Sequence, residues 1–275
     1  MNYGHWIAHF KTNKRDRPEP DWSAAFSMTE KKRQLLARSI AEYQLGDGGG
    51  ECRLVARDAE SFRGAAEEAR QVVDMWFDEE REHSRLLACA VERIGAEFIT
   101  DTFAFRMFYA VRRALGVQFE MLVLLIVEIV STGYYRVIRQ HVGDEPLAAM
   151  CKLILRDEAR HIDFHRDRLA AQHPRGFGFW RARQFPLLAH GCASFLWLGH
   201  GRCLRALGGT RAELFGHVRS GVANFLGELA AQTTASVKND RKTHEREEFS
   251  EGWKQRARPL ADGTTKHAAA GRELR

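Results

Sequence analysis

The chain has 275 residues, of which 44% are hydrophobic and 28% charged, a balance that excludes wholesale disorder and low-complexity or collagen-like sequences. The formal net charge is only +6, and much of the basic surplus lies after Val237, so we expect no nucleic-acid partner. Prolines are scarce, and apolar residues recur with helical spacing over long stretches. This pattern predicts an all-α protein.

The first predicted elements are an arm and a helix. Residues 1–26 contain Trp6, Phe10 and Trp22, which we expect to pack on the body of the protein. Ser27 and Glu30 have the spacing of a capping box, which favours the start of a helix. That helix is predicted to run to about residue 59, with an interruption in the glycine-rich stretch 46–50.

Three further long helices follow. The sequence predicts them at about residues 64–94, 117–142 and 144–172, and a glycine or a proline follows each one. The connection between residues 94 and 117 is long enough for a crossover. Four such helices with this crossover are typical of a ferritin-like four-helix bundle, which we place at residues 27–175.

The remaining chain is predicted to pack on the bundle and then to become disordered. A fifth helix is expected at about 183–207, and a second capping box, Thr210 with Glu213, opens a sixth. We assign these helices to residues 176–237. Residues 238–275 are polar and charged without an apolar period, which predicts a largely disordered tail.

Cysteine usage predicts a cytoplasmic protein. The chain has five cysteines and no C-x-x-C pair, namely Cys52, Cys89, Cys151, Cys192 and Cys203. We interpret them as reduced thiols, and the N-terminal residues lack the pattern of a secretory signal. The longest apolar run, residues 121–130, is about half the length of a bilayer span and contains Glu128, so no membrane helix is expected.

Two Glu-x-x-His motifs are the main candidates for functional residues. Glu80 and His83 form the first, and Glu158 and His161 form the second. At a spacing of three residues, both side chains of each pair leave the same face of a helix. One such match is expected by chance, so the placement of the motifs on two long helices matters more than the motifs themselves.

An acidic residue precedes each motif on the neighbouring predicted helix. These residues are Asp47 and Glu128. Glu128 lies in the most apolar run of the chain, where a carboxylate must be protonated, ion-paired or bound to metal. Glu120 lies on a different helical face and is the poorer candidate. The order acid, Glu-x-x-His, acid, Glu-x-x-His supplies the donors that bind two adjacent metal ions in a bundle core.

This pattern resembles the ferritin-like di-iron carboxylate superfamily, over about residues 40–170. The resemblance implies six metal ligands: Asp47, Glu80, His83, Glu128, Glu158 and His161. Asp47 departs from the usual glutamate, and Glu51 is the alternative. The resemblance also implies that Asp157 accepts a hydrogen bond from His83 and that Glu79 accepts one from His161. No paired cysteines of a rubredoxin domain are present, which excludes a full-length rubrerythrin.

Two other residues are candidates for the site. His165 follows His161 by one turn and could be an added ligand or a proton relay, although a hydrogen-bonded core histidine is the favoured interpretation. Tyr135 follows Glu128 by two turns and could serve as a radical or as a hydrogen-bond donor, although packing is favoured. No catalytic residue beyond the metal ligands is predicted.

The resemblance implies an enzyme, a di-metal oxidoreductase that activates O2 or peroxide and acts on a small organic substrate. Its cofactor would be two iron ions, with Mn/Fe or di-manganese as alternatives, and an electron-donor protein and a homodimer are both compatible with it. One alternative is peroxide reduction of the rubrerythrin kind or ferroxidase activity. Another is a helical interaction protein without metal.

Overall fold

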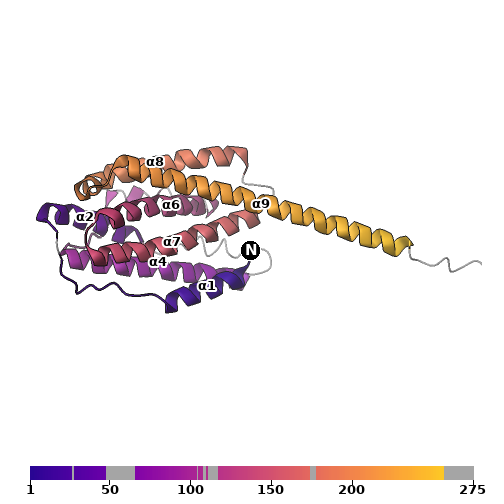
Figure 1. The fold of residues 1–275 in the computed structure, drawn as a ribbon, viewed down its shortest axis with the longest axis horizontal. Coiled ribbons are helices and arrows are strands. Elements are labelled where there is room, and N and C mark those ends of the chain that lie inside the picture. The colour runs from indigo at the N-terminus through magenta and orange to yellow at the C-terminus, as the bar shows by residue number, and fades with distance from the viewer. Residues whose placement is uncertain are drawn as a thin grey trace, which may run out of the picture. The chain divides into compact units, whose positions relative to one another are not determined.

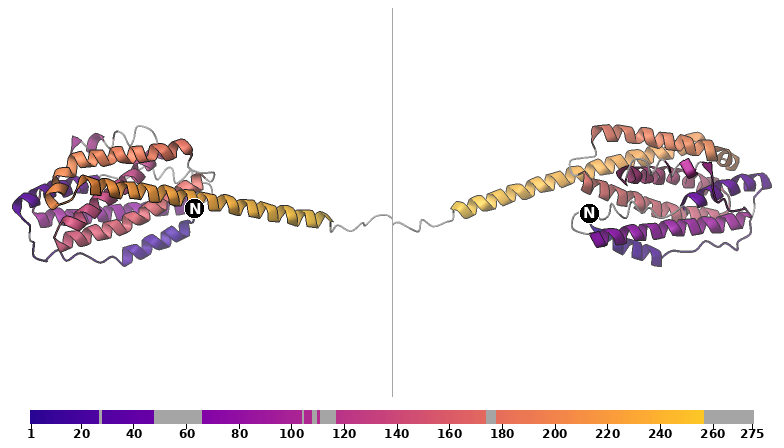
Figure 2. Two further views of the ribbon diagram at one scale, coloured as in Figure 1. Left: turned by 45° about the horizontal axis from the view of Figure 1, so that its top comes forward. Right: turned by 180° about the vertical axis from the view of Figure 1, so that it is seen from behind.

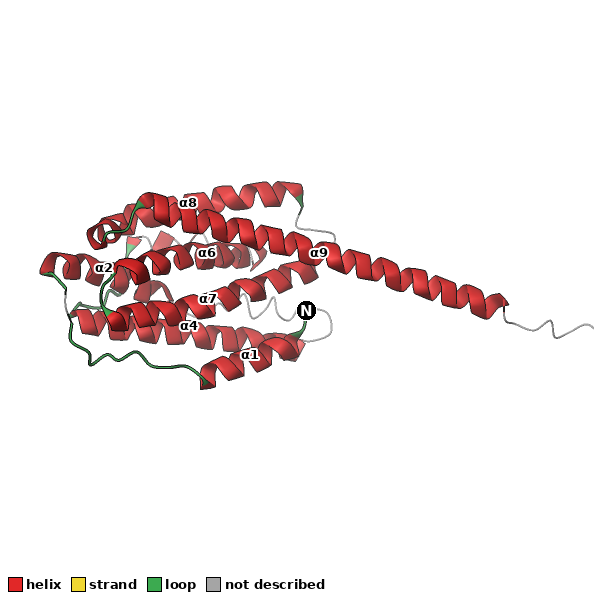
Figure 3. Ribbon diagram, viewed as in Figure 1, coloured by secondary structure: helices red, strands yellow, loops and turns green. Residues whose placement is uncertain are grey.

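The computed structural model of the protein is built from long helices (Figure 1). It describes residues 1–26, 28–47, 66–103, 105–107, 110, 117–173 and 178–256. Within these ranges every regular element is a helix and none is a strand (Figure 3). The predicted all-α class is confirmed.

The chain divides into two compact units, Met1–Thr233 and Thr234–Arg275. The long helices are α1 (Tyr3–Arg15), α2 (Glu30–Asp47), α4 (Ala66–Ile94), α6 (Val117–His141), α7 (Glu145–Gln172), α8 (Phe179–Leu207) and α9 (Arg211–Arg256). Helix α9 belongs to the first unit up to Thr233, and the described residues of the second unit, 234–256, are helical as well.

The ends of the helices follow the local signals of the sequence. Gly95 after α4 and Gly143 after α6 both have a φ of 69°, a left-handed conformation that favours glycine and stops a helix. Asp144 caps α7, because its carboxylate accepts a hydrogen bond of 3.1 Å from the Leu147 amide. The Thr210–Glu213 capping box before α9 is formed in both directions, at 3.1 and 3.3 Å.

The helices of the first unit pack around one main core. Helix α4 contacts α2 and α7, α6 contacts α7, and α8 covers both α2 and α6. Leu36, Leu87, Ile129 and Ile154 are fully buried members of this core and come from four different helices. Apolar burial is the main favourable term in folding, so this core holds α2, α4, α6 and α7 around the polar residues described below.

A smaller core lies under α1. The prediction of an arm at residues 1–26 did not include a helix, yet Tyr3–Arg15 is helical and lies along α4 (Figure 2). The Asn2 side chain caps this helix by accepting a hydrogen bond from the His5 amide. Trp6 and Phe10 are buried one turn apart, which confirms that the arm packs on the body.

The C-terminal prediction needs correction. Helix α9 continues to Arg256, past residue 238, where the sequence predicts a disordered tail. The segment has no proline before residue 259 and is rich in Lys, Arg, Glu and Gln, which favour helix without an apolar period. Several predictions lie outside the described residues: the Ser27 cap, the continuation of the first helix to residue 59, Glu51, the thiol of Cys52, and the tail from residue 257 to 275.

One stretch of α6, Phe119–His141, is long and apolar enough to cross a membrane by length and composition, with a mean hydropathy of 1.7. The run of residues 121–130 considered alone underestimates this length. Of this stretch, 67% is buried inside the protein, which is also the pattern of a core helix in a soluble protein. Glu128 lies in its middle and faces other polar side chains of the core.

Candidate metal centre

The two Glu-x-x-His motifs lie on α4 and α7, which pack against each other. Within each motif the helical spacing directs the carboxylate and the imidazole to the same side. His83 and His161 are both fully buried, and their ring centroids are 5.6 Å apart. The fold thus brings the motifs together in one site inside the protein.

Two carboxylates lie between the two imidazoles. Glu80 places Oε2 3.7 Å from His83 Nδ1 and Oε1 3.0 Å from His161 Nδ1. Glu158 places Oε1 3.8 Å from His83 Nδ1 and Oε2 4.0 Å from His161 Nδ1. Each carboxylate therefore faces both rings with a different oxygen, as a carboxylate does when it bridges two metal ions.

Several buried polar atoms of this site have no hydrogen bond. They are Nδ1 of His83, His161 and His165 and Oε2 of Glu128 and Glu158. The contact between Glu80 and His161 is short but lacks hydrogen-bond geometry. A buried polar atom left unsatisfied costs about 1–3 kcal/mol, so a cluster of them needs a ligand to compensate.

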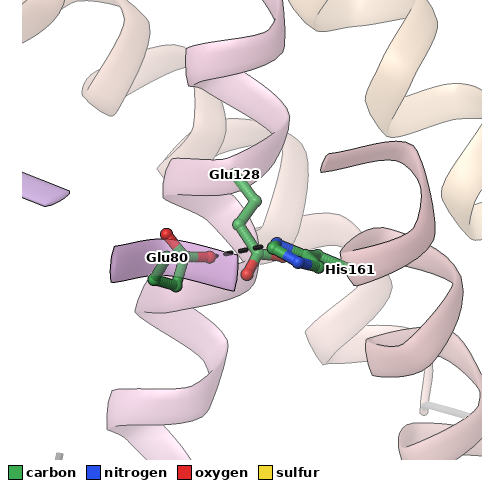
Figure 4. A group of neighbouring side chains, drawn as sticks. All are labelled: Glu80, Glu128 and His161. Carbon is green, nitrogen blue, oxygen red and sulfur yellow. Dashed lines mark ion pairs between the residues drawn. The ribbon is translucent and has the colours of Figure 1, made fainter. Parts of the chain in front are cut away.

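Glu128 approaches the site from α6. Its side chain is almost fully buried, and its Oε1 lies 3.3 Å from His165 Nε2 on α7. In Figure 4 its carboxylate lies beside the ring of His161, on the side of the ring that faces Glu80. The most apolar helix of the protein thus carries a carboxylate into the same space as the two motifs.

The donor atoms fall into two groups in which all atoms lie within 4.8 Å of one another. Glu80, Glu128 and His161 form one group, and Glu80, His83 and Glu158 form the other. Glu80 belongs to both. This sharing fits two neighbouring metal positions with a common carboxylate, in line with the donor set of dinuclear helix-bundle sites.

The outer faces of the two histidines are bound by acids from the opposite motif. His83 Nε2 lies 3.2 Å from Asp157 Oδ2, and His161 Nε2 lies 3.0 Å from Glu79 Oε2. These are the two pairs that the resemblance implies. An acceptor on Nε2 fixes the orientation of each ring and leaves Nδ1 directed at the carboxylates.

Sequence reasoning missed the groups that hold these outer acids. Arg17 is nearly buried, and its guanidinium lies 2.6 Å from Asp157 and 3.8 Å from Glu79. The amide of Asn13 at the end of α1 donates hydrogen bonds to the same two carboxylates. The N-terminal residues therefore help to build the site, and no motif spacing in the sequence indicates this.

Asp47, the last residue of α2, lies beside the centre. Its Oδ2 accepts a hydrogen bond of 3.2 Å from the hydroxyl of Tyr135. Asp47 belongs to neither group of converging donor atoms within the described residues. It is therefore the most peripheral of the six predicted ligands, and the alternative at this position, Glu51, lies outside the described residues.

Burial and neighbouring charges set the protonation of the metal-free centre. Burial opposes the charge on His83, but the Asp157 hydrogen bond and Glu80 outweigh it and raise the pKa of His83 to about 10. Burial and the Glu80 charge raise the pKa of Asp47 to about 7 and that of Glu158 well above its usual value. Bound cations would have to displace these protons.

Other polar and aromatic residues of α4, α6 and α7 do not belong to the groups of converging donors. Ser131 and Thr132 on α6 donate hydrogen bonds to carbonyls of their own helix, at 3.0 and 2.7 Å. Trp76, which had no predicted role, donates from its indole nitrogen to Glu80 Oε1 at 3.1 Å. Cys151 is a buried free thiol, and burial raises its pKa to about 12.

Comparison of the chain with models of known protein families, with curated proteins and with solved structures finds no match. The donor atoms of the site therefore indicate which metal ions it can bind. These atoms are carboxylate oxygens and imidazole nitrogens, without thiolate, which suits divalent iron, manganese and zinc better than soft metal ions.

Proposed function

We propose that the protein is a di-metal carboxylate oxidoreductase that activates O2 or peroxide. The observation that carries this proposal is the position of Glu80 and Glu158, each with one oxygen toward the unpartnered Nδ1 of His83 and the other toward that of His161. We further propose that α2, α4, α6 and α7 form a ferritin-like bundle with a crossover between α4 and α6.

The donor set favours a redox-active metal pair. Two imidazoles and three or four carboxylates suit two iron ions, with Mn/Fe or two manganese ions as alternatives. Once bound, such a pair supplies electrons to O2 or peroxide and accepts them again from a reductant. A small organic molecule is the proposed substrate, because apolar side chains line much of the surrounding core.

The protein's own residues would prepare the site for this chemistry. Asp157 and Glu79 hold the two imidazole rings in place through Nε2. Trp76 fixes one oxygen of Glu80, and Phe164 next to it closes the apolar wall of the centre on the α1 side. Such fixed donors keep their positions when the metal charge changes, and the apolar wall excludes bulk water.

Metal content tests the proposal first. Full-length wild type, Glu128→Ala and the control Glu82→Ala are purified after growth with iron and manganese. Glu82 is a carboxylate of α4 that pairs with Arg85 and belongs to neither group of converging donors. Inductively coupled plasma mass spectrometry is expected to find about two metal ions per chain in wild type and control, and fewer in Glu128→Ala. Metal-free wild type that also refuses Fe(II) under anaerobic loading would overturn the proposal.

Oxygen consumption then separates the functional classes. Fe(II)-loaded protein is mixed with O2 in the presence and absence of a panel of small organic molecules. O2 uptake that depends on an added molecule supports the oxygenase proposal. Rapid and repeated Fe(II) oxidation without any such molecule would instead establish ferroxidase activity. Consumption of peroxide together with a reductant, without an organic substrate, would establish a peroxidase.

A further inference from the structure

Next to the candidate centre, α2, α6 and α8 enclose a polar and aromatic group that the proposed function leaves unused. We term it the tyrosine cluster, and its members are Ser39, Tyr43, Tyr134, Tyr135 and His200. Tyr134, Tyr135 and Ser39 are buried, and His200 and Tyr43 are partly buried. Three tyrosines in mutual contact inside a protein need a reason beyond packing, because phenylalanine fills the same space without a hydroxyl to satisfy.

The tyrosine rings form a continuous contact. Tyr43 and Tyr134 are stacked, with ring centroids 3.9 Å apart and an angle of 10° between their planes. Tyr135 stands edge-on to both, at 5.3 Å from Tyr43 and 5.4 Å from Tyr134. Rings at this spacing couple electronically, so an electron can pass from Tyr134 through Tyr43 to Tyr135.

Tyr135 connects the tyrosine cluster with the candidate metal centre. The hydroxyl of Tyr135 donates to Asp47 Oδ2 at 3.2 Å, and Asp47 is one of the six proposed ligands. The aromatic rings therefore lead from a residue of the metal centre to Tyr134 without a gap.

On the side away from the centre, a chain of polar contacts leads from the Tyr134 hydroxyl toward solvent. The hydroxyls of Tyr134 and Ser39 are 2.7 Å apart, and Ser39 Oγ lies 2.9 Å from His200 Nδ1. His200 Nε2 faces Glu42 Oε2 at 3.8 Å. The side chains of His200 and Glu42 are 14% and 22% exposed, so this path begins in the core and ends at solvent.

His200 can act as a base toward Ser39 through its Nδ1 atom. We assign the ring proton of His200 to Nε2, because Nε2 lies on the side of the Glu42 carboxylate, and Nδ1 then accepts from Ser39. Burial lowers the pKa of His200, which keeps the ring neutral in the resting protein. Burial also raises the pKa of Tyr134 well above its usual value, so its hydroxyl stays protonated until an electron is removed.

We propose that Tyr134 is a redox-active tyrosine that passes electrons from the α8 side of the protein to the metal centre, with Ser39 and His200 as its proton relay. This inference rests on the proposed function, which supplies the oxidant, namely the metal pair after reaction with O2 or peroxide.

The step balances in atoms and charge. Tyr134 loses one electron, which travels through Tyr43 and Tyr135 and reduces the oxidised centre by one electron. Its O–H bond breaks, and the proton moves to Ser39 Oγ while the Ser39 hydroxyl proton moves to His200 Nδ1. A neutral tyrosyl radical and an imidazolium beside Glu42 result. One electron from a reduced electron-donor protein and return of the proton from His200 restore Tyr134.

The first test does not need the metal. Full-length metal-free protein is oxidised by a photoexcited ruthenium polypyridyl complex with persulfate, and the radical is identified by electron paramagnetic resonance with ring-deuterated tyrosine. Wild type and the control Tyr3→Phe, on α1, are expected to give a persistent neutral tyrosyl radical, and Tyr134→Phe is expected to lose it. An unchanged signal in Tyr134→Phe, or a tryptophan radical in wild type, would overturn the proposal.

The relay is tested with a matched pair of variants. Ser39→Ala removes the hydroxyl and is expected to slow radical formation by about 100-fold, the usual order for loss of a positioned proton acceptor, and to abolish the solvent deuterium isotope effect. Ser39→Thr keeps the hydroxyl and is expected to restore both. Equal rates of radical formation in Ser39→Ala and Ser39→Thr, with unchanged isotope effects, would refute the relay. His200→Gln removes the final proton acceptor and is expected to slow radical formation in the same way as Ser39→Ala.

Metal content is measured on the same preparations to separate the two proposals. Protein that binds two metal ions and shows no Tyr134 radical after photo-oxidation or after reaction of the Fe(II) form with O2 contradicts only the redox role of Tyr134. Protein that binds no metal contradicts the proposed function, and with it the delivery of electrons to the centre, whatever radical the ruthenium complex generates.

Discussion

The two halves of the candidate centre share Glu80, and Glu158 faces the imidazoles of both halves, but their remaining groups differ. The α2-side half consists of His83 and Asp47, and Asp47 is held by the hydroxyl of Tyr135. The α6-side half consists of His161 and Glu128, and Glu128 is held by a third buried imidazole, that of His165.

This difference indicates that the two proposed metal positions would not be equivalent. Glu128 extends from the middle of a buried helix, and its donor atoms converge with those of Glu80 and His161. Asp47 is the terminal residue of its helix and lies outside the converging groups. We therefore expect the α6-side position to bind metal more tightly, and the α2-side position to exchange ligands more readily during the reaction.

The largest effect should come from a residue that both halves share. Glu158→Ala removes a carboxylate that faces both imidazoles, so we expect loss of both metal ions, whereas Glu128→Ala should lose only the α6-side ion. Metal content by mass spectrometry measures the difference. If Glu158→Ala and Glu128→Ala retained the same amount of metal, Glu158 would not be shared between the positions.

A second prediction concerns Arg17, which serves the two halves unequally, at 2.6 Å from Asp157 and 3.8 Å from Glu79. Arg17→Ala removes the shortest ion pair of the fully buried Asp157, which keeps Arg156 at 3.2 Å, and should lower the free energy of unfolding by about 1.5–3 kcal/mol. Denaturant unfolding of the metal-free protein measures this value.

The control for Arg17 is Lys14→Ala, which breaks an exposed ion pair with Asp78 at 3.4 Å and should cost less than about 1 kcal/mol. The double variant Arg17→Ala with Asp157→Asn removes both charges and should recover part of the loss. Equal destabilisation by Arg17→Ala and Lys14→Ala would show that Arg156 and His83 suffice as partners of Asp157.

Local signals of the sequence account for most of the fold. The bounds of α4, α6 and α7 follow from apolar periodicity, glycines and the Asp144 cap, and the position of the two motifs on α4 and α7 follows with them. Helix α1 was not predicted, because its apolar residues are few and its stability comes from Trp6 and Phe10 packing on other helices.

The site could be predicted only in part, for a related physical reason. Repeated spacing along one helix identifies Glu80, His83 and their counterparts, because those residues share a face. Contacts between distant segments leave no such trace. The contacts of Arg17 with Asp157 and of Ser39 with His200 join residues that no periodicity relates, so they emerge only once the helices are packed.

A third prediction isolates the α6-side half. His165→Gln removes the imidazole that holds Glu128, and loss of such a supporting group usually costs about 10–100-fold in metal affinity. We expect the loss at one of the two positions only, measured by calorimetric titration of metal-free protein with Mn(II). His190→Gln on the exposed face of α8 is the control and should leave both affinities unchanged. Equal weakening of both positions would contradict independent halves.

The smallest effect should come from the counterpart of His165 in the α2-side half. Tyr135→Phe removes the hydrogen bond to Asp47 and should weaken the α2-side metal position by about 1 kcal/mol, with the α6-side position unchanged. Tyr134→Phe alters the neighbouring ring, which has no hydrogen bond to Asp47, and is the matched control. Equal losses in the two variants would assign the effect to packing.

The protonation of Asp47 predicts how metal affinity at the α2-side position changes with pH. The pKa of Asp47 is about 7 in the folded, metal-free protein, against 3.8 for an ordinary aspartate. Between these two pH values the folded state binds more protons than the unfolded state, so stability falls as pH rises. Metal binds the ionised carboxylate, so affinity at the α2-side position should rise with pH through about 7 and then level off. The Tyr135 hydrogen bond lowers the pKa of Asp47, so Tyr135→Phe should move the increase in metal affinity at the α2-side position to higher pH. The pH dependence of metal affinity at the α6-side position should not change.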